Sequence, residues 1–354
     1  MGGYTPRPKA AEEQPRLIRL DSNENPYGPS PRALEAMRRA ISSTNSYPDD
    51  DSTALRNGLA THHAVPAEQV LVTAGSTGML SLLCHIMLAP GLNAVTSERS
   101  FIVYSMAVQA VGARLIETPM REDRFDLGAI LDAITEETRL VFVSNPNNPT
   151  GTVLEAAEVD RFLAEIPGHV VVVLDEAYHD YASYFAVQRK IEYSHSLDQL
   201  KSGASVVVLR TFSKAHGLAG LRIGYGIGPE ELMTYCARMR DTFSVSSIAQ
   251  AAALAALGDH NYVTRVVSTN AAQAQVVGVG LSELGYRVVP TSANFLYCDV
   301  GEDAATVADR LREQGVSVRP MGMWGAPNCL RVSVGTAEQN QFLLNAAHTI
   351  RRKK

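Results

Sequence analysis

Cysteine is scarce in this chain of 354 residues, where only Cys84, Cys236, Cys298 and Cys329 occur. None of them stands in a C-x-x-C pair or in another spacing that is typical of a metal site. All four lie within apolar segments, so we expect reduced side chains in the core. This use of cysteine favours a cytoplasmic protein over a secreted one that is held together by disulfides.

The sequence also lacks long hydrophobic runs and a strong excess of either charge. Its apolar stretches are far too short to span a bilayer. The N-terminal segment contains Glu12 and Glu13 and has no apolar core of the kind that a signal peptide needs. With a formal net charge of −5 and 19% charged residues, the composition is that of an ordinary globular protein. We therefore expect neither a membrane nor a nucleic-acid partner, and no metal site.

Apolar, β-branched runs alternate with helical patterns in the first part of the chain. The runs are VLVT at 70–73, LVFVS at 140–144, VVVVLD at 170–175 and VVVLRT at 206–211. Such runs suit parallel strands that are buried on both faces, so we predict an α/β domain with a mostly parallel sheet covered by helices. From about residue 229, helices and short strands indicate a smaller α+β domain. We predict an N-terminal arm (1–44) that joins the small domain, a large domain (45–240) and a small C-terminal domain (241–354).

Each of these four apolar strands is followed by polar residues. They are Ser76 and Thr77, then Asn145 and Asn148, then Asp175 and Tyr178, and last Thr211, Ser213 and Lys214. Ligands of open α/β sheets bind at the carboxyl ends of the strands. One such strand end means little, because Asn and Asp also serve in turns and caps. Four together predict a single ligand site.

The side chains at these strand ends suit pyridoxal 5′-phosphate (PLP). Its aldehyde needs a lysine with which to form a Schiff base. Its pyridine nitrogen needs an anion, so that the ring stays protonated and can accept electrons. Its phosphate needs amides at a helix N-terminus, hydroxyl groups and a cation, for which Arg222 is available.

Several motifs resemble the class I/II aminotransferases of PLP fold type I. They are NPNNPTG at 145–151, DEAY at 175–178 and TFSK…GLAGLR at 211–222. Within that group the chain most resembles the histidinol-phosphate branch, through LDSNENPYGPSP at 20–31, YPD at 47–49, SANFL at 292–296 and LRVSVGT at 330–336. The resemblance covers nearly the whole chain. It implies a PLP-dependent aminotransferase that uses an amino donor and a 2-oxo acid, most closely histidinol phosphate and 2-oxoglutarate in histidine biosynthesis.

The resemblance assigns the catalytic roles to Lys214, Asp175 and Tyr178. Lys214 is then the Schiff-base lysine, and it also moves a proton between the substrate and the cofactor. We expect Arg222 and partial burial to disfavour the charged form of this lysine. Asp175 pairs with the pyridine nitrogen, and Asn148 and Tyr178 form hydrogen bonds to the ring oxygen O3′.

The remaining cofactor contacts are also implied by the resemblance. Ser76, Thr77, Thr211, Ser213 and Arg222 are expected to hold the phosphate. Phe101, which precedes Tyr104 by three residues, is expected to lie flat on the cofactor ring. Tyr47 is expected to reach the cofactor phosphate of a neighbouring subunit, which predicts an obligate homodimer.

The expected substrate contacts come from both ends of the chain. Arg331 suits a clamp for a substrate anion, because a guanidinium binds carboxylate or phosphate in a bidentate way. Arg319 is a candidate for a second anion contact, although a solvated strand end would explain it equally well. Asn23 and Tyr27 in the N-terminal arm are expected to close over the substrate.

Other functions remain open at this point. The sequence departs from the usual family pattern at Ser76-Thr77-Gly78, at Asp241-Thr242-Phe243 and at His216, which puts the substrate in doubt more than the reaction. An aromatic or other amino-acid aminotransferase is an alternative, as is a decarboxylase resembling threonine-phosphate decarboxylase. A dehydrogenase is disfavoured, because GYGIG at 224–228 is only part of a G-x-G-x-x-G motif. A PLP-binding regulator would need an appended DNA-binding segment.

Overall fold

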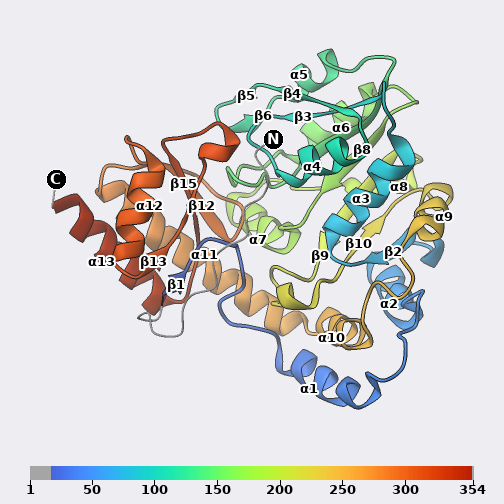
Figure 1. Cartoon of the computed structure of the whole chain (residues 1–354), viewed down its shortest axis with the longest axis horizontal. Coiled ribbons are helices and arrows are strands. Elements are labelled where there is room, and N and C mark those ends of the chain that lie inside the picture. Colours follow the sequence, from blue (N-terminus) through green and yellow to red (C-terminus); the bar gives the residue numbers. More distant parts are fainter. Residues whose placement is uncertain (1–16, 353–354) are drawn as a thin grey trace.

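The computed structural model describes residues 17–352, which are arranged around a large sheet of seven strands and a smaller sheet of four (Figure 1). The order in the large sheet is β2-β10-β9-β8-β7-β3-β4. Its strands are β2 (Val70–Thr73), β3 (Asn93–Ser97), β4 (Arg114–Thr118), β7 (Thr138–Ser144), β8 (Val171–Asp175), β9 (Val206–Thr211) and β10 (Gly224–Ile227). All the paired neighbours run parallel except β10, which is antiparallel to both β2 and β9. The mostly parallel sheet is therefore as the sequence predicts.

Helices cover the large sheet on both faces. Alternate residues of β8 show the two sides: Val171 and Val173 belong to one core cluster, and Val172 and Leu174 belong to another. The first cluster is completed by α3 (Ser76–Met87), α4 (Val103–Ala110) and α9 (Glu230–Met239). The second includes α2 (Thr53–His63), α5 (Leu127–Asp132), α6 (Ala156–Glu165) and α8 (Ser196–Lys201). Burial on both faces explains why these strands are apolar without alternation.

The small sheet is antiparallel, with the order β11-β12-β15-β14. Its strands are β11 (Arg287–Val289), β12 (Phe295–Asp299), β14 (Arg319–Pro320) and β15 (Cys329–Ser333). Residues of α12 (Ala304–Glu313), α13 (Ala337–Arg352) and the end of α11 (His260–Glu283) complete its core. The N-terminal arm joins this domain, because β1 (Ile18–Arg19) pairs with β13 (Val316–Ser317). Residues 1–16 of the predicted arm lie outside the described residues.

Helix α10 (Ser247–Leu257) packs with the large domain, although the predicted boundary at residue 240 precedes it. Its alanines at 249, 252, 253 and 256 belong to the same core cluster as β2 and β7. It also packs along α1 (Pro31–Ala40). Helix α11 then passes from this region to the small domain (Figure 1). These contacts connect α10 to the large sheet and to α1, and the predicted division into 1–44, 45–240 and 241–354 stays a prediction.

All four cysteines are free and buried. Among the helices of residues 17–352, none is both long enough and apolar enough to cross a membrane.

Candidate active site

Polar groups gather at the carboxyl edge of the large sheet. Strand β8 ends at Asp175, β9 ends at Thr211, and β7 leads directly into the turn at 145–148. These three strands run parallel, so their ends share one edge. Strand β10 begins at this edge, where Gly224 lies opposite both Thr73 and Thr211. The edge is the part of an open α/β sheet at which ligands bind.

Lys214 lies in the loop after β9, beneath the N-terminal arm. Its Nζ donates a hydrogen bond to the Asn23 carbonyl oxygen at 3.3 Å and lies 5.5 Å from the centroid of the Tyr178 ring. Asn23 Nδ2 donates in turn to the Tyr178 hydroxyl at 2.9 Å. Asn23 and Tyr178 are both buried, and the lysine is half-buried. The fold thus brings together three residues from widely separated parts of the chain.

Asp175 is a buried carboxyl group with two hydrogen-bond donors. The Tyr104 hydroxyl donates to its Oδ2 at 2.9 Å, and the Ala177 N–H donates to its Oδ1 at 3.2 Å. Burial raises the pKa of Asp175 to about 6, although these donors and the charge of Lys214 lower it. A cation placed against this carboxylate would lower its pKa. The site is therefore suited to a protonated ring nitrogen.

The start of helix α3 faces the guanidinium of Arg222. The helix begins at Ser76 and Thr77, directly after Gly75. Gly75 has a φ of 77°, and a Cβ built on it would lie only 2.6 Å from Arg222 Nη2. A Cβ on Gly224 would lie 2.6 Å from the Ser76 nitrogen. Both glycines let this cation and a helix N-terminus approach each other, which favours binding of an anion.

Two hydroxyl groups complete the arrangement around Arg222. Its Nη1 donates to Ser213 Oγ at 3.5 Å and to the Ala219 carbonyl at 2.9 Å. Thr211 Oγ1 donates to the same Ser213 Oγ at 3.0 Å. Arg222 therefore contacts the hydroxyl cluster. A cation, hydroxyl groups and a helix N-terminus suit a phosphate group.

Arg331 on β15 is a buried cation that contacts the turn after β7. Its Nη1 donates to Asn148 Oδ1 at 2.6 Å, and its Nη2 donates to the Asp21 carbonyl at 3.0 Å. Because the amide oxygen of Asn148 accepts from Arg331, its NH₂ group is the part that can donate to a ligand. Arg331 thus links the small domain, the large domain and the N-terminal arm.

Aromatic rings lie beside Asp175. Phe101 is half-buried and meets the Tyr104 ring edge-on, with the centroids 5.7 Å apart. Tyr104 is stacked on Phe142 at 4.8 Å. Phe101 therefore contacts Tyr104, whose hydroxyl donates to Asp175. Asp175 is the carboxyl group that the sequence assigns to the pyridine nitrogen.

Three predicted site residues are less closely connected to this group. Tyr47 is 82% exposed and stacks on Phe243 with the centroids 4.5 Å apart. The Tyr27 side chain is exposed, and its N–H donates to Asn25 Oδ1 at 2.9 Å. Arg319 lies directly opposite Arg331 in the β14–β15 pair, so that both side chains extend from the same face of the small sheet.

Sequence reasoning missed several residues that orient this site. Tyr104, which donates to Asp175, stands out in the sequence only by its place three residues after Phe101. Asn294, within the SANFL segment, donates to the Asn23 carbonyl at 3.1 Å. Ser333 Oγ donates to Asn23 Oδ1 at 3.0 Å and accepts from the Asn23 N–H at 2.7 Å. Ser333 lies within the LRVSVGT segment, but that segment gives no signal for a contact with Asn23.

The donor set fits PLP. A partly buried amine, a buried carboxyl group with a raised pKa, and a phosphate-binding arrangement lie at one sheet edge. Within residues 17–352, no group of His, Cys, Asp and Glu side chains is arranged to hold a metal ion.

Comparison with known proteins identifies relatives along nearly the whole chain. Residues 15–346 match the family model for aminotransferase class I and II. The chain is 43% identical over 330 residues to histidinol-phosphate aminotransferase 2 of Pseudomonas fluorescens, with 93% of this chain and 88% of that protein covered. It is 40% identical over 335 residues to histidinol-phosphate aminotransferase of Moorella thermoacetica, with 94% and 85% covered.

A solved structure shares this fold at clear sequence similarity. The structure of histidinol-phosphate aminotransferase from Sinorhizobium meliloti in complex with pyridoxal-5′-phosphate superposes with a TM-score of 0.90 and 31% identity, covering 96% of this chain and 91% of that one. An aspartate aminotransferase from Thermus thermophilus gives a TM-score of 0.83 at 26% identity, with 96% and 97% covered. With the family model spanning most of its length, this chain belongs to the class I and II aminotransferases.

Proposed function

We propose that this protein is a PLP-dependent transaminase that moves the amino group of histidinol phosphate to 2-oxoglutarate, in histidine biosynthesis. One observation carries the reaction type: Lys214, the buried Asp175 and a phosphate cradle lie together at the carboxyl edge of the sheet. The phosphate cradle is formed by Arg222, the hydroxyl groups of Thr211 and Ser213, and the N-terminus of α3. The relatives named above, which are similar over nine tenths of the chain, support the choice of amino donor.

The phosphate and the protonated ring nitrogen of the cofactor would bind to different residues of this site. The first turn of α3, at Ser76 and Thr77, would hold the phosphate together with Arg222 and the hydroxyl groups of Thr211 and Ser213. Asp175 would hold the proton of the ring nitrogen, because its buried carboxylate gains a cationic partner there. Tyr178 and Asn148 would bind the ring oxygen, and Phe101 would pack against the ring.

The chemical step depends on Lys214. When bound, PLP draws electrons away from the substrate carbon that carries the amine. The Lys214 amine would take the proton from that carbon as a general base, and as a general acid it would then deliver the proton to the cofactor. Its hydrogen bond to the Asn23 carbonyl and its place over the Tyr178 ring orient the amine toward the site.

Arginine side chains are the proposed substrate contacts. Arg331 would bind the anionic group of either substrate through its guanidinium. Arg319, opposite it on β14, would contribute a second positive charge for the phosphate of histidinol phosphate. Asn23 and Tyr27 would cover the substrate from the N-terminal arm.

We further propose that the protein is a homodimer of the cytoplasm. The exposed Tyr47, stacked on the exposed Phe243, is available to reach a neighbouring subunit. The four free, buried cysteines support a reducing compartment.

The amino donor is tested by half-reactions of the purified PLP-loaded protein. Histidinol phosphate, phenylalanine, threonine phosphate and glutamate are added singly, and the cofactor absorbance is followed. We expect glutamate and histidinol phosphate to convert the cofactor, with histidinol phosphate at least tenfold faster than phenylalanine, because one charge-assisted contact contributes about 1.5–3 kcal/mol.

Other outcomes separate the alternatives. Faster conversion by phenylalanine would favour an aromatic aminotransferase. Release of carbon dioxide from threonine phosphate would favour a decarboxylase. No conversion by glutamate would contradict the transaminase itself.

A further inference from the structure

A short hairpin of the large domain holds a strained turn against the small domain. Strands β5 (Met120–Arg121) and β6 (Arg124–Phe125) pair through a two-residue turn. The turn residues, Glu122 and Asp123, have φ values of 53° and 60°. Residues other than glycine are seldom found in this left-handed region, and surrounding contacts must hold them there.

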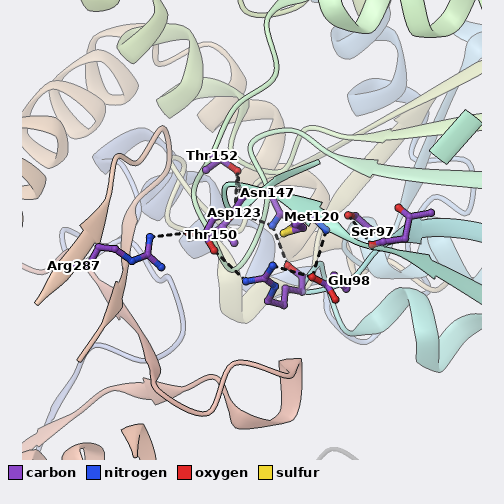
Figure 2. A network of polar contacts seen from close by, with 10 residues as sticks. Ser97, Glu98, Met120, Asp123, Asn147, Thr150, Thr152 and Arg287 are labelled. Atoms are coloured by element: carbon purple, nitrogen blue, oxygen red, sulfur yellow. Dashed lines mark hydrogen bonds and ion pairs between the residues drawn. The ribbon is translucent and has the colours of Figure 1, made fainter. Parts of the chain in front are cut away.

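Asp123 supplies those contacts through two ion pairs. Its side chain is 9% exposed, and its Oδ1 lies 3.1 Å from Arg99 Nη1. Its Oδ2 lies 2.9 Å from Arg287 Nη1. Arg287 extends from strand β11 of the small domain toward the hairpin, as Figure 2 shows. Arg99 belongs to the large domain, in the loop after β3. One carboxylate therefore joins guanidinium groups from both domains.

The same hairpin is bonded to two loops that carry proposed cofactor contacts. Arg99 precedes Phe101 by two residues, and its carbonyl accepts a hydrogen bond from Asn147 Nδ2 at 3.1 Å. Asn147 is directly followed by Asn148. Thr152 Oγ1, in the same loop, donates to the Asp123 carbonyl at 2.9 Å (Figure 2). These contacts connect Asp123 to the loops that carry Phe101 and Asn148.

The small domain that Arg287 anchors also carries the proposed substrate clamp. Strand β11 pairs with β12, and β12 pairs with β15, which holds Arg331. A second contact joins the two domains, because Trp324 Nε1 donates to the Ser100 carbonyl at 2.9 Å. Ser100 lies between Arg99 and Phe101.

We propose that Asp123, with Arg99 and Arg287, is a latch between the domains that positions Arg331 over the substrate. Asp123 is then a positioning residue for substrate binding, and this role rests on the proposed function. Without the Asp123 carboxylate, Arg287 would lose its ion pair with the hairpin, whereas Arg99 would keep its ion pair with Glu98. Strand β11 would move away from the hairpin, and Arg331 would lose its alignment with Asn148.

The test compares Asp123→Asn with Arg124→Gln. Arg124 lies on the same hairpin, but its ion pair with Glu158 and its hydrogen bond to the Val153 carbonyl both stay within the large domain, which makes it a control for the contact between the domains. Arg287→Gln removes only the pair to the small domain and leaves the hairpin's own carboxylate in place. Each full-length variant is measured for kcat and KM with L-glutamate, and for its affinity for PLP.

Trp324 is the chain's single tryptophan, so its fluorescence reports on the domain boundary directly. Acrylamide quenching is measured without substrate, both with PLP and without it. Because this readout needs no turnover, it still tests the latch if glutamate proves not to be a substrate and the proposed function fails.

For Asp123→Asn we expect KM for glutamate to rise about tenfold while kcat changes less than threefold. Acrylamide quenching of Trp324 should at least double, and PLP affinity should stay within twofold of the original. Arg287→Gln should show the same pattern more weakly, and Arg124→Gln should leave all three quantities unchanged. The latch is overturned if Arg287→Gln matches Arg124→Gln in both KM and quenching. It is also overturned if Asp123→Asn loses PLP affinity while KM stays constant.

Discussion

Lys214 differs from the other lysines of the described chain in its surroundings. The sequence holds six lysines, and of those within residues 17–352, Lys190 and Lys201 are exposed whereas Lys214 is half-buried. The Nζ of Lys214 is held by a backbone carbonyl and lies over a tyrosine ring. Such a place restricts where the amine can point, which a reacting amine requires.

Replacing Lys214 by Ala should abolish turnover. The variant should still bind PLP through the phosphate cradle and Asp175, but without the absorbance of a lysine-linked cofactor. Lys201→Ala is the control, because that exposed lysine pairs only with the exposed Asp198. A Lys214→Ala protein with the original spectrum and rate would mean that another lysine carries the chemistry.

Replacing Asp175 by Asn should slow proton removal from the substrate by several orders of magnitude. A neutral partner no longer favours the protonated ring on which the electron sink depends. Stopped-flow half-reactions with glutamate measure this step. A loss smaller than about tenfold, or about 1.4 kcal/mol, would show that the carboxylate does not serve the ring nitrogen.

The raised pKa of Asp175 also predicts how pH affects the stability of the protein without cofactor. Folding raises this pKa from 3.8 to about 6 through burial. Between these values the folded state binds more protons than the unfolded state, so its stability falls as the pH rises. Above pH 6 the carboxyl group is ionised in both states, so the loss of stability caused by burying its charge no longer changes with pH.

Thermal unfolding of the cofactor-free protein tests this linkage. Asp175→Asn should be more stable than the original at pH 7, and the difference should shrink toward pH 4. The reverse order at pH 7 would contradict a raised pKa. Loading with PLP should remove the effect, because the cationic ring favours the ionised carboxylate.

Strand ends set the geometry of the site at the level of the elements. Arg210 on β9 donates to Glu176 Oε2 through Nε at 3.0 Å and Nη2 at 2.8 Å, directly after the last residue of β8. Burial alone would raise the pKa of Glu176, but Arg210 and His179 hold it well below its usual range. This buried ion pair fixes two neighbouring strand ends against each other, and with them Asp175 and the Lys214 loop.

The contact between β10 and α3 gives a prediction at this level. A Cβ on Gly224 would lie 2.6 Å from the Ser76 nitrogen, so Gly224→Ala should push back the helix N-terminus that binds phosphate. We expect the dissociation constant for PLP to rise at least tenfold. Gly220→Ala is the control, since nothing lies within 4 Å of its Cβ. Equal PLP affinity in the two variants, measured by fluorescence titration, would argue against this phosphate site.

The whole molecule encloses its site from three directions. Arg331 enters from the small domain, Asn23 from the N-terminal arm, and Lys214 from the large domain. Tyr47 lies apart from this group and is solvent-exposed in the single chain, and we propose that it completes the site of a second subunit. This arrangement suits a site that a second subunit completes.

Homodimerisation should therefore be needed for full activity. Analytical ultracentrifugation at assay concentration should give a dimer. Tyr47→Phe should weaken PLP binding while the protein stays dimeric. Tyr235→Phe alters another exposed tyrosine and should have no effect on PLP. A fully active monomer would refute the proposal.

The sequence by itself determined the fold class and the chemistry of the strand ends. Apolar runs with no alternation require burial on both faces, and this is a local property of the chain. The motifs around Asn148, Asp175 and Lys214 follow those runs directly, so their position at one sheet edge follows from strand direction. Strand β10, which the sequence shows only as the glycine-rich segment at 224–228, is an antiparallel strand between β2 and β9.

Only the tertiary structure decided which distant residues complete the site. Asn23 meets Tyr178 across 155 positions, and Arg331 meets Asn148 across 183. Ser333 and the Asp123 latch follow no periodic or spacing rule, because their partners lie on other elements. Local patterns record which face of an element is buried, whereas contacts between elements depend on how the domains pack.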